Sequence, residues 1–179
     1  VQASAAIVAA GARQTAITMA KADGTEVLAG TMSVGADASP TALETRLRSL
    51  QPLVDPVILR DVALGMKSPS IAVIMAPDQN MGAYYPFSLA EKLAAITEPS
   101  PWYSDASASP WGRPIIPLEM ISVLFQYNTH AFEFPTRGPA VGLFADQEIR
   151  LLQGPLFVGE PYEIERELVF IGGSKRTES

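Results

Sequence analysis

The chain contains no cysteine and a single histidine, His130. Without thiols it can have no disulfide framework, no thiolate metal site and no cysteine nucleophile. One imidazole also excludes a metal site built mainly from histidine. A chain of 179 residues can still bury roughly 70% of the surface that its unfolded form exposes, so it needs no covalent cross-link to fold.

Positive charge is scarce as well, with 13 Lys and Arg against 19 Asp and Glu and a formal net charge of -6. Because binding to phosphates needs a basic face, we expect no nucleic-acid partner. No uninterrupted apolar stretch approaches the roughly 18 residues of a membrane span, and the apolar first residues lack the basic segment of a signal peptide. We therefore expect no membrane partner and a cytoplasmic location.

An antiparallel hairpin is predicted in the first part of the sequence. Residues 14–22 and 25–34 flank Asp23-Gly24, a dipeptide typical of type I′ turns, in which both central residues have positive φ. Apolar residues recur at alternate positions on both strands, as a half-buried sheet requires: Ile17, Met19, Leu28, Met32 and Val34.

A helix is predicted directly after this hairpin. Ser39 is a suitable N-cap and Pro40 suits the first helical position. Leu43, Leu47 and Leu50 would then lie on one face of the helix. Residues 51–83 are interrupted by proline and glycine, which favours a connector around one strand candidate at residues 71–76.

The second half of the sequence is more regular. Ser88 and Glu91 form a capping box that predicts the start of a short helix. Residues 115–127 are apolar on so many sides that a helix there must be largely buried. Two strands are predicted near residues 141–152 and 162–171.

A short internal repeat bears on the domain organisation. GARQT, ending at Thr15, resembles GSKRT, ending at Thr177, and each follows an apolar run; so short a match also arises by chance. If the repeat is real, we expect strands of a first unit over 1–35, a helix and connector over 36–83, and a second unit over 84–179 that is cut before its last strands. The first residue is not methionine, so we expect the true start to lie upstream.

The most specific motifs lie in a proline-rich loop and the turn after it. They read T-E-P-S-P-W-Y-S-D and then W-G-R-P-I-I-P-L-E-M. These resemble the G-D-x-N-P-x-H-x-D loop and the G-G-P-I-A-H-G turn of the MaoC-like acyl dehydratases and (R)-specific enoyl-CoA hydratases. Pro101 and Asp105 match the loop, and Gly112, Pro114 and Ile115 match the turn. The later VGEPYEIERELV is similar to the start of a strand in that family.

The resemblance is confined mainly to residues 84–179. It implies an α+β fold of the hotdog type, in which an antiparallel sheet wraps a long buried helix, as a double hotdog or part of one. It also implies an acyl-CoA or acyl-carrier thioester as the substrate, no separate cofactor, and either a homodimer or pairing with a second hotdog unit.

The two catalytic residues of that family are replaced in this chain. Where the family has an aspartate and a histidine, this sequence has Glu98 and Tyr103. Glu98 could hold or activate a water molecule. A phenol is almost wholly protonated at neutral pH whereas an imidazole is mostly free base, so we expect Tyr103 to act as a proton or hydrogen-bond donor. Alternatively, Glu98 is a solvated charge at a helix end and Tyr103 packs the loop.

Four further residues are candidates for contact with the substrate: Asp105, Gly112, Ile116 and Glu119. Two of them have structural alternatives. Asp105 also suits a turn-forming role in the sequence SDAS. Glu119 also suits the first turn of a helix, where the helix dipole favours a carboxylate.

Three functions therefore stay open. The first is a hydro-lyase, an acyl-CoA hydratase or dehydratase with an altered catalytic pair. The second is a thioesterase that uses a carboxylate with helix-end amides as the oxyanion hole. The third is a non-catalytic ligand-binding or structural repeat. An enzyme requires Glu98 and Tyr103 to converge beside the start of the buried helix at residues 116–119.

Overall fold

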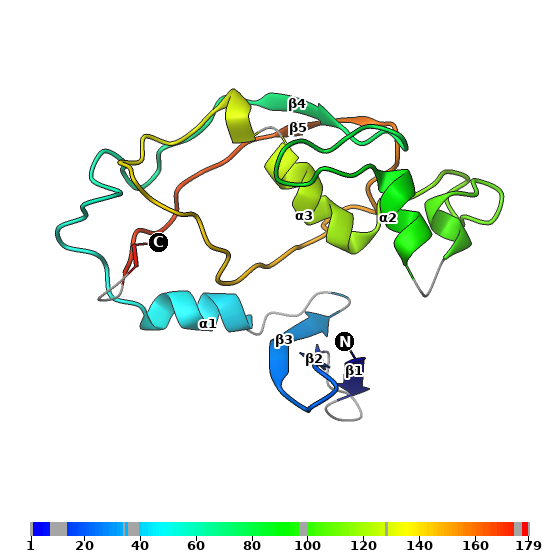
Figure 1. Ribbon diagram of the computed structural model, residues 1–179, viewed down its shortest axis with the longest axis horizontal. Coiled ribbons are helices and arrows are strands. Elements are labelled where there is room, and N and C mark those ends of the chain that lie inside the picture. The colour runs from blue at the N-terminus through cyan, green and yellow to red at the C-terminus, as the bar shows by residue number, and fades with distance from the viewer. Residues whose placement is uncertain are drawn as a thin grey trace. The chain divides into compact units, whose positions relative to one another are not determined.

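The computed structural model describes residues 2–7, 14–33, 35, 40–96, 100–127, 129–173 and 177–178. Within these ranges it is an α+β structure with two small antiparallel sheets and three α-helices (Figure 1), so the expected α+β class is confirmed. The chain divides into two compact units. Unit 1 comprises Val1–Gln51 with Phe144–Glu148, and unit 2 comprises Pro52–Leu143 with Ile149–Ser179.

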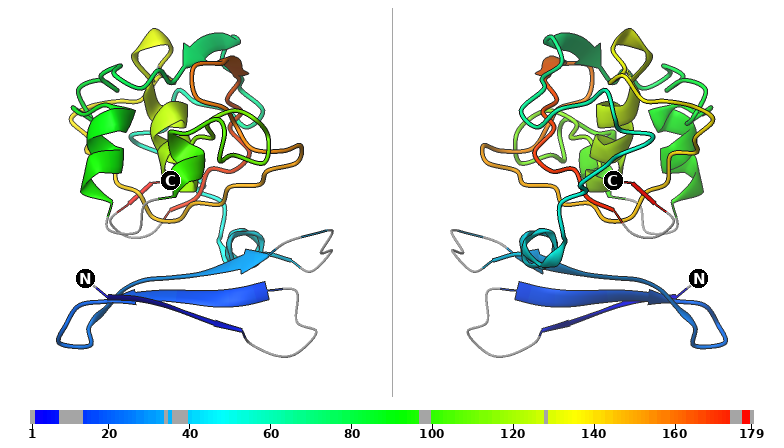
Figure 2. Two further views of the ribbon diagram at one scale, coloured as in Figure 1. Left: turned by 90° about the vertical axis from the view of Figure 1, so that its right-hand side faces the viewer. Right: turned by 90° about the vertical axis from the view of Figure 1, so that its left-hand side faces the viewer.

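The sheet of unit 1 is an antiparallel meander of three strands (Figure 2). The strands are β1 (Gln2–Ile7), β2 (Gln14–Ala20) and β3 (Glu26–Ser33), in that order. Ile17 lies opposite Gly30, and the register shifts at a bulge near Met19. The predicted hairpin is therefore confirmed as β2 and β3.

The turn of this hairpin differs from the predicted type I′ turn. Among the described residues only glycines have positive φ, and here that residue is Gly24, at 85°. The Oδ1 atom of Asp23 instead accepts a hydrogen bond from the Thr25 N–H at 2.9 Å, and the Gly24 N–H donates to the Lys21 carbonyl at 2.9 Å. The Lys21 N–H also donates to the Thr25 carbonyl at 2.9 Å, so the turn is closed by main-chain bonds together with the Asp23 side chain, and Asp23 has no left-handed backbone.

The expected half-burial of β3 is wrong. Every residue of β3 is exposed, including Leu28 at 50% and Met32 at 48%. Alternation of apolar residues favours a strand, but burial of one face also requires a second layer over it, and the alternation does not encode that layer.

The predicted helix after the hairpin is confirmed as α1 (Ala42–Ser49), with a later start than expected. Its N-cap is Thr41, whose hydroxyl accepts the Glu44 N–H at 3.1 Å while the Glu44 carboxylate accepts the Thr41 N–H at 3.0 Å. This reciprocal pair satisfies two N–H groups at once. Ser39, the predicted N-cap, lies outside the described residues.

The strand predicted over residues 141–152 is wrong. This segment belongs to neither sheet, and Leu152 is 89% exposed. Within unit 1, Arg46 forms an ion pair with Asp146 at 2.7 Å, and the Thr41 hydroxyl donates to Glu148 at 2.5 Å. Side chains of the α1 region, rather than the main chain of another strand, hold this part of the segment.

The core of unit 2 is built around α3 (Leu118–Tyr127). The helix contacts β4 (Ile71–Ile74), which pairs with β5 (Pro161–Ile164) in an antiparallel sheet (Figure 1). The buried apolar residues of the unit form one cluster: Val73, Met75, Met81, Leu89, Ile116, Met120, Ile121, Val123, Leu124 and Ile164. The predicted buried helix is confirmed along one face, whereas Phe125 is 42% exposed.

The strand predicted over residues 162–171 is confirmed in part. Ladder pairing covers β5, where Ile164 lies opposite Ile71. Isolated antiparallel bridges then join Glu167 to Lys67 and Gly172 to Pro52. The segment expected to be a connector thus supplies the partner of β5, and the strand predicted within it is confirmed as β4.

The short helix α2 (Leu89–Ala95) begins as predicted. The Ser88 hydroxyl accepts the Glu91 N–H at 3.2 Å, and the Glu91 carboxylate accepts the Ser88 N–H at 2.7 Å. Leu89, the first helical residue, is 1% exposed. The capping box therefore places the start of α2 in the core of unit 2.

Candidate functional site

The candidate site is the loop over residues 100–117, which leads into α3. It begins with the 3₁₀ turn η1 (Pro101–Tyr103), and the Ser100 hydroxyl accepts the Trp102 N–H at 3.4 Å. The Asp105 N–H then donates to the Pro101 carbonyl at 2.8 Å. Proline suits the first position of such a turn because its fixed φ is already helical. The turn places Tyr103 in a half-buried position.

A second turn follows around Asp105. Its Oδ1 atom accepts hydrogen bonds from the Ser107 hydroxyl at 2.7 Å and the Ser107 N–H at 2.8 Å. These two donors, the hydroxyl first, hold the pKa of the Asp105 carboxyl below its usual value. Asp105 is engaged by donors of its own loop, as its structural alternative predicts.

Gly112 closes this part of the loop with a left-handed backbone. Its φ is 66°, and its N–H donates to the Ser109 carbonyl at 2.9 Å. Glycine adopts such a φ without the steric cost of a Cβ atom. A Cβ atom placed on Gly112 would meet no heavy atom within 4 Å, so the backbone conformation alone requires glycine here.

The two ends of the loop are joined to one another. The Ile115 N–H donates to the Trp102 carbonyl at 2.9 Å. The rings of Trp102 and Trp111 meet edge to face, with centroids 5.7 Å apart, and they are 42% and 44% exposed. The loop is therefore a closed structure that presents an aromatic pair to solvent.

The start of α3 is fixed by the turn before β5. The Ile116 N–H donates to the Leu156 carbonyl at 2.7 Å, and the Val158 N–H donates to the Pro114 carbonyl at 3.0 Å. Ile116 itself is 3% exposed and belongs to the core. These contacts give the loop a rigid base.

A cation also joins the loop to that turn. The Arg113 guanidinium lies 4.4 Å from the centroid of the Phe157 ring and forms an ion pair with Glu160. Cation–π contacts of this kind are favourable at the surface. Arg113 therefore contributes to the attachment of the loop.

Glu119 lies in the first turn of α3, as expected, and forms an ion pair across to α2. Its carboxylate is 2.7 Å from the Lys92 ammonium, and its side chain is 65% exposed. The Lys92 ammonium also lies 5.5 Å from the centroid of the Phe87 ring. The position of Glu119 in the helix could be predicted from the sequence, but its partner Lys92 could not.

The predicted site residues are therefore only partly brought together. Tyr103, Asp105 and Gly112 share one closed loop, and Ile116 lies in the core at its base. Glu98, the expected water-activating carboxylate, lies outside the described residues, so its approach to Tyr103 stays a prediction.

A groove of about 440 Å³ lies elsewhere in unit 2. It runs between the end of α3 and β5 and is lined by Phe125, Gln126, Glu163, Ile164, Glu165 and Arg166. The Arg166 guanidinium donates to the Phe125 carbonyl at 3.0 Å across it. No predicted site residue lines this groove; residues 163–166 lie in the segment VGEPYEIERELV, whose resemblance indicated a strand rather than a groove.

The described part of the chain shows neither a metal site nor a membrane-spanning helix. Its histidine and carboxylate side chains form no group of three or more that could hold a metal ion. None of its helices combines the length and the apolar character needed to cross a bilayer.

Comparison with known proteins adds no relative. No family model, curated protein or solved structure matches the chain.

Proposed function

We propose that the chain carries an acyl-thioester-binding unit of the MaoC-like hotdog type, which hydrates an enoyl-CoA or dehydrates the corresponding hydroxyacyl-CoA. The observation that carries this proposal is the closed loop that joins η1 to α3. The motif residues Pro101, Asp105 and Gly112 each form a turn in it. The loop then leads into α3, whose buried face contacts β4 of an antiparallel sheet.

In this proposal Tyr103 is the hydrogen-bond donor to the thioester carbonyl. It lies half-buried in η1, one residue from the loop-closing carbonyl of Trp102. A preorganised donor to a carbonyl oxygen stabilises the negative charge that develops there as a nucleophile adds to the conjugated double bond. A phenol does this as the neutral group, without prior loss of its proton.

Glu98 is the proposed acid and base. As the water oxygen bonds to Cβ of the enoyl thioester, the Glu98 carboxylate takes a proton from that water and returns one to Cα. The product is the β-hydroxyacyl thioester, and dehydration is the same sequence reversed. One carboxylate can serve both transfers because it ends in its starting protonation state.

The test is a panel of enoyl- and acyl-CoA esters, measured for loss of the enoyl thioester, for free thiol and for quenching of tryptophan fluorescence. Trp102 is adjacent to Tyr103, so fluorescence reports binding even without turnover. We expect hydration by the unaltered chain, a loss of about 10²- to 10⁴-fold in Glu98→Gln and of about 10²-fold in Tyr103→Phe.

Matched controls are Tyr84→Phe and Glu26→Gln, which alter exposed residues outside the loop and should leave the rate unchanged. Full activity in either site variant would refute the assignment of that residue. Release of thiol in place of hydration would identify a thioesterase, and binding without turnover a ligand-binding repeat. No turnover and no binding across the panel would refute the proposal as a whole.

A further inference from the structure

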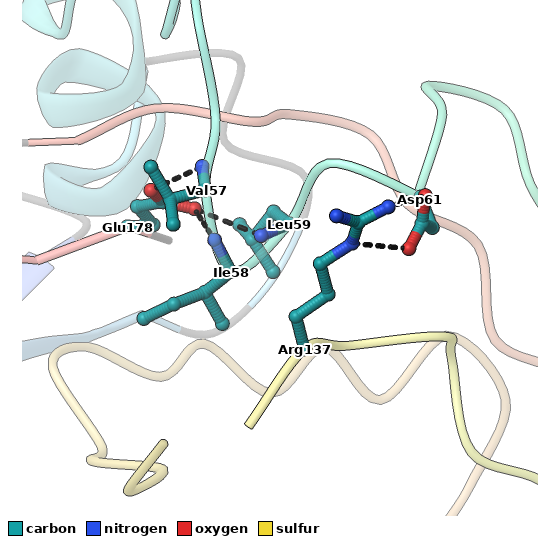
Figure 3. Close-up of polar contacts among 6 residues, drawn as sticks. All are labelled: Val57, Ile58, Leu59, Asp61, Arg137 and Glu178. Carbon is teal, nitrogen blue, oxygen red and sulfur yellow. Dashed lines mark hydrogen bonds and ion pairs between the residues drawn. The ribbon is translucent and has the colours of Figure 1, made fainter. Parts of the chain in front are cut away.

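One carboxylate in unit 2 is held by three successive main-chain N–H groups. Glu178 Oε1 accepts from the Val57 N–H at 2.7 Å, and Oε2 accepts from the N–H groups of Ile58 and Leu59 at 2.9 and 2.8 Å (Figure 3). These three bonds, that from Leu59 first, hold the pKa of Glu178 below its usual value. Both carboxylate oxygens of Glu178 are therefore bound by main-chain N–H groups.

The three N–H groups converge because they precede a turn. The Val62 N–H donates to the Leu59 carbonyl at 3.1 Å and closes that turn. Successive N–H groups in a turn conformation point the same way and form a concavity that binds anions. The residues that supply them, from Val57 to Leu59, have apolar side chains, so the main chain provides the donors.

This donor set is held in place independently of Glu178. The Arg137 N–H donates to the Ile58 carbonyl at 2.8 Å. The Arg137 guanidinium also donates to both carboxylate oxygens of Asp61, at 2.6 and 2.9 Å, and Figure 3 shows the two side chains side by side. A two-point contact of this geometry orients its partners as well as attracting them. The peptide groups should therefore stay aligned when the Glu178 side chain is removed.

Glu178 reaches the donors through a close approach of two chain segments. It forms an antiparallel bridge with Gly173, where an added Cβ atom would lie 2.8 Å from the Thr177 carbonyl oxygen. The neighbouring Gly172 forms a bridge with Pro52. Residue 178 is thus positioned beside the donors by its main chain, and its carboxylate completes the contact.

We propose that the N–H groups of Val57, Ile58 and Leu59 form a carboxylate-binding site whose ligand in the native chain is Glu178. A tethered carboxylate has an effective concentration in the millimolar range or above, so free carboxylates compete poorly with it. When Glu178 is replaced, the site binds a small free carboxylate such as acetate. This site is separate from the proposed acyl-thioester site and does not depend on it.

The experiment is an acetate titration of the 179-residue chain and its Glu178→Ala variant, followed by ¹⁵N-resolved NMR at constant ionic strength with chloride as the balancing anion. In the variant, acetate should shift the amide signals of Val57, Ile58 and Leu59 saturably. In the unaltered chain the same signals should not respond. Acetate should also raise the thermal midpoint of the variant part of the way back to that of the unaltered chain, and it should not raise the midpoint of the unaltered chain.

Glu167→Ala is the matched control, because Glu167 is a glutamate of the same unit that pairs with a side chain, the Lys67 ammonium, at 3.1 Å. Acetate should not restore stability to that variant. An equal response to chloride, an equal response of the unaltered chain, or no response of the three amides would overturn the proposal.

Glu178→Gln tests the same contact if the alanine variant does not fold. Glutamine keeps the shape and one acceptor oxygen but removes the charge. The amide protons of residues 57–59 should then move upfield from their positions in the unaltered chain, because a neutral acceptor forms a weaker hydrogen bond. Unchanged positions would refute the contact.

Discussion

Truncation of Leu124 tests the packing of α3 in the core of unit 2. Leu124 is 1% exposed, so Leu124→Ala removes buried methyl groups and leaves a cavity, at a cost of about 2–5 kcal/mol. In a protein of this size each kcal/mol lowers the thermal midpoint by roughly 2–4 °C, which predicts a fall of about 4–20 °C. Urea unfolding followed by tryptophan fluorescence measures the loss of unfolding free energy, and a thermal scan of the same signal measures the fall in the midpoint, because Trp102 and Trp111 both lie in unit 2.

Leu118→Ala is the matched control on the same helix. Leu118 is 51% exposed, and leucine and alanine have similar helix propensities. The same chemical change should therefore cost about 1 kcal/mol or less, since only part of the side chain leaves an apolar environment. Equal losses in the two variants, or a larger loss at Leu118, would show that the described face of α3 is not the buried one.

Two further predictions concern the loop and the carboxylates. Gly112→Ala should lower the free energy of unfolding by about 1–2 kcal/mol, because φ is 66° even though the added Cβ atom meets no neighbour. Gly142→Ala is the control and should leave the free energy of unfolding unchanged, because Gly142 has open space around it and no positive φ. Equal losses for the two variants in urea unfolding would contradict the prediction. Hydrogen bonds from Ser107 to Asp105 and from the N–H groups of residues 57–59 to Glu178 hold the pKa of each carboxyl below its usual value, so in acid the folded state binds fewer protons than the unfolded state. Their contribution to stability is complete above their usual pKa values and is lost as pH falls through the lower folded-state pKa values. Urea midpoints between about pH 5 and pH 3 should therefore fall less steeply in Glu178→Gln, and an unchanged slope would rule out this linkage.

Features encoded by neighbouring residues could be predicted from the sequence. The capping box of Ser88 and Glu91 lies within four residues, and it fixes where α2 begins. The apolar residues of α3 predicted that it is buried, although the structure buries fewer of its sides than expected. The turn-forming alternative for Asp105 likewise rests on a partner two positions away. In each case the interacting residues lie within about one helical turn or one loop turn of each other, so local geometry determines the contact.

Features that depend on distant partners could not be predicted. Residues 141–152 alternate like a strand, but a strand also needs a partner whose main chain is free to pair. The ion pair of Glu119 joins two helices, and nothing near Glu119 in the sequence identifies Lys92. The N–H groups that bind Glu178 have no sequence signature, because almost every residue supplies the same donor.

Unit 1 is built from two separate segments of the chain, and this has a consequence for biosynthesis. Its segment Phe144–Glu148 follows Pro52–Leu143, which belongs to unit 2. The ribosome makes a chain from its first residue onward, so Arg46 leaves it long before its ion-pair partner Asp146. This ion pair can therefore form only after most of unit 2 has been synthesised. Domains usually fold as units while the chain is still growing, but here the earlier unit is the one that is completed by a later segment.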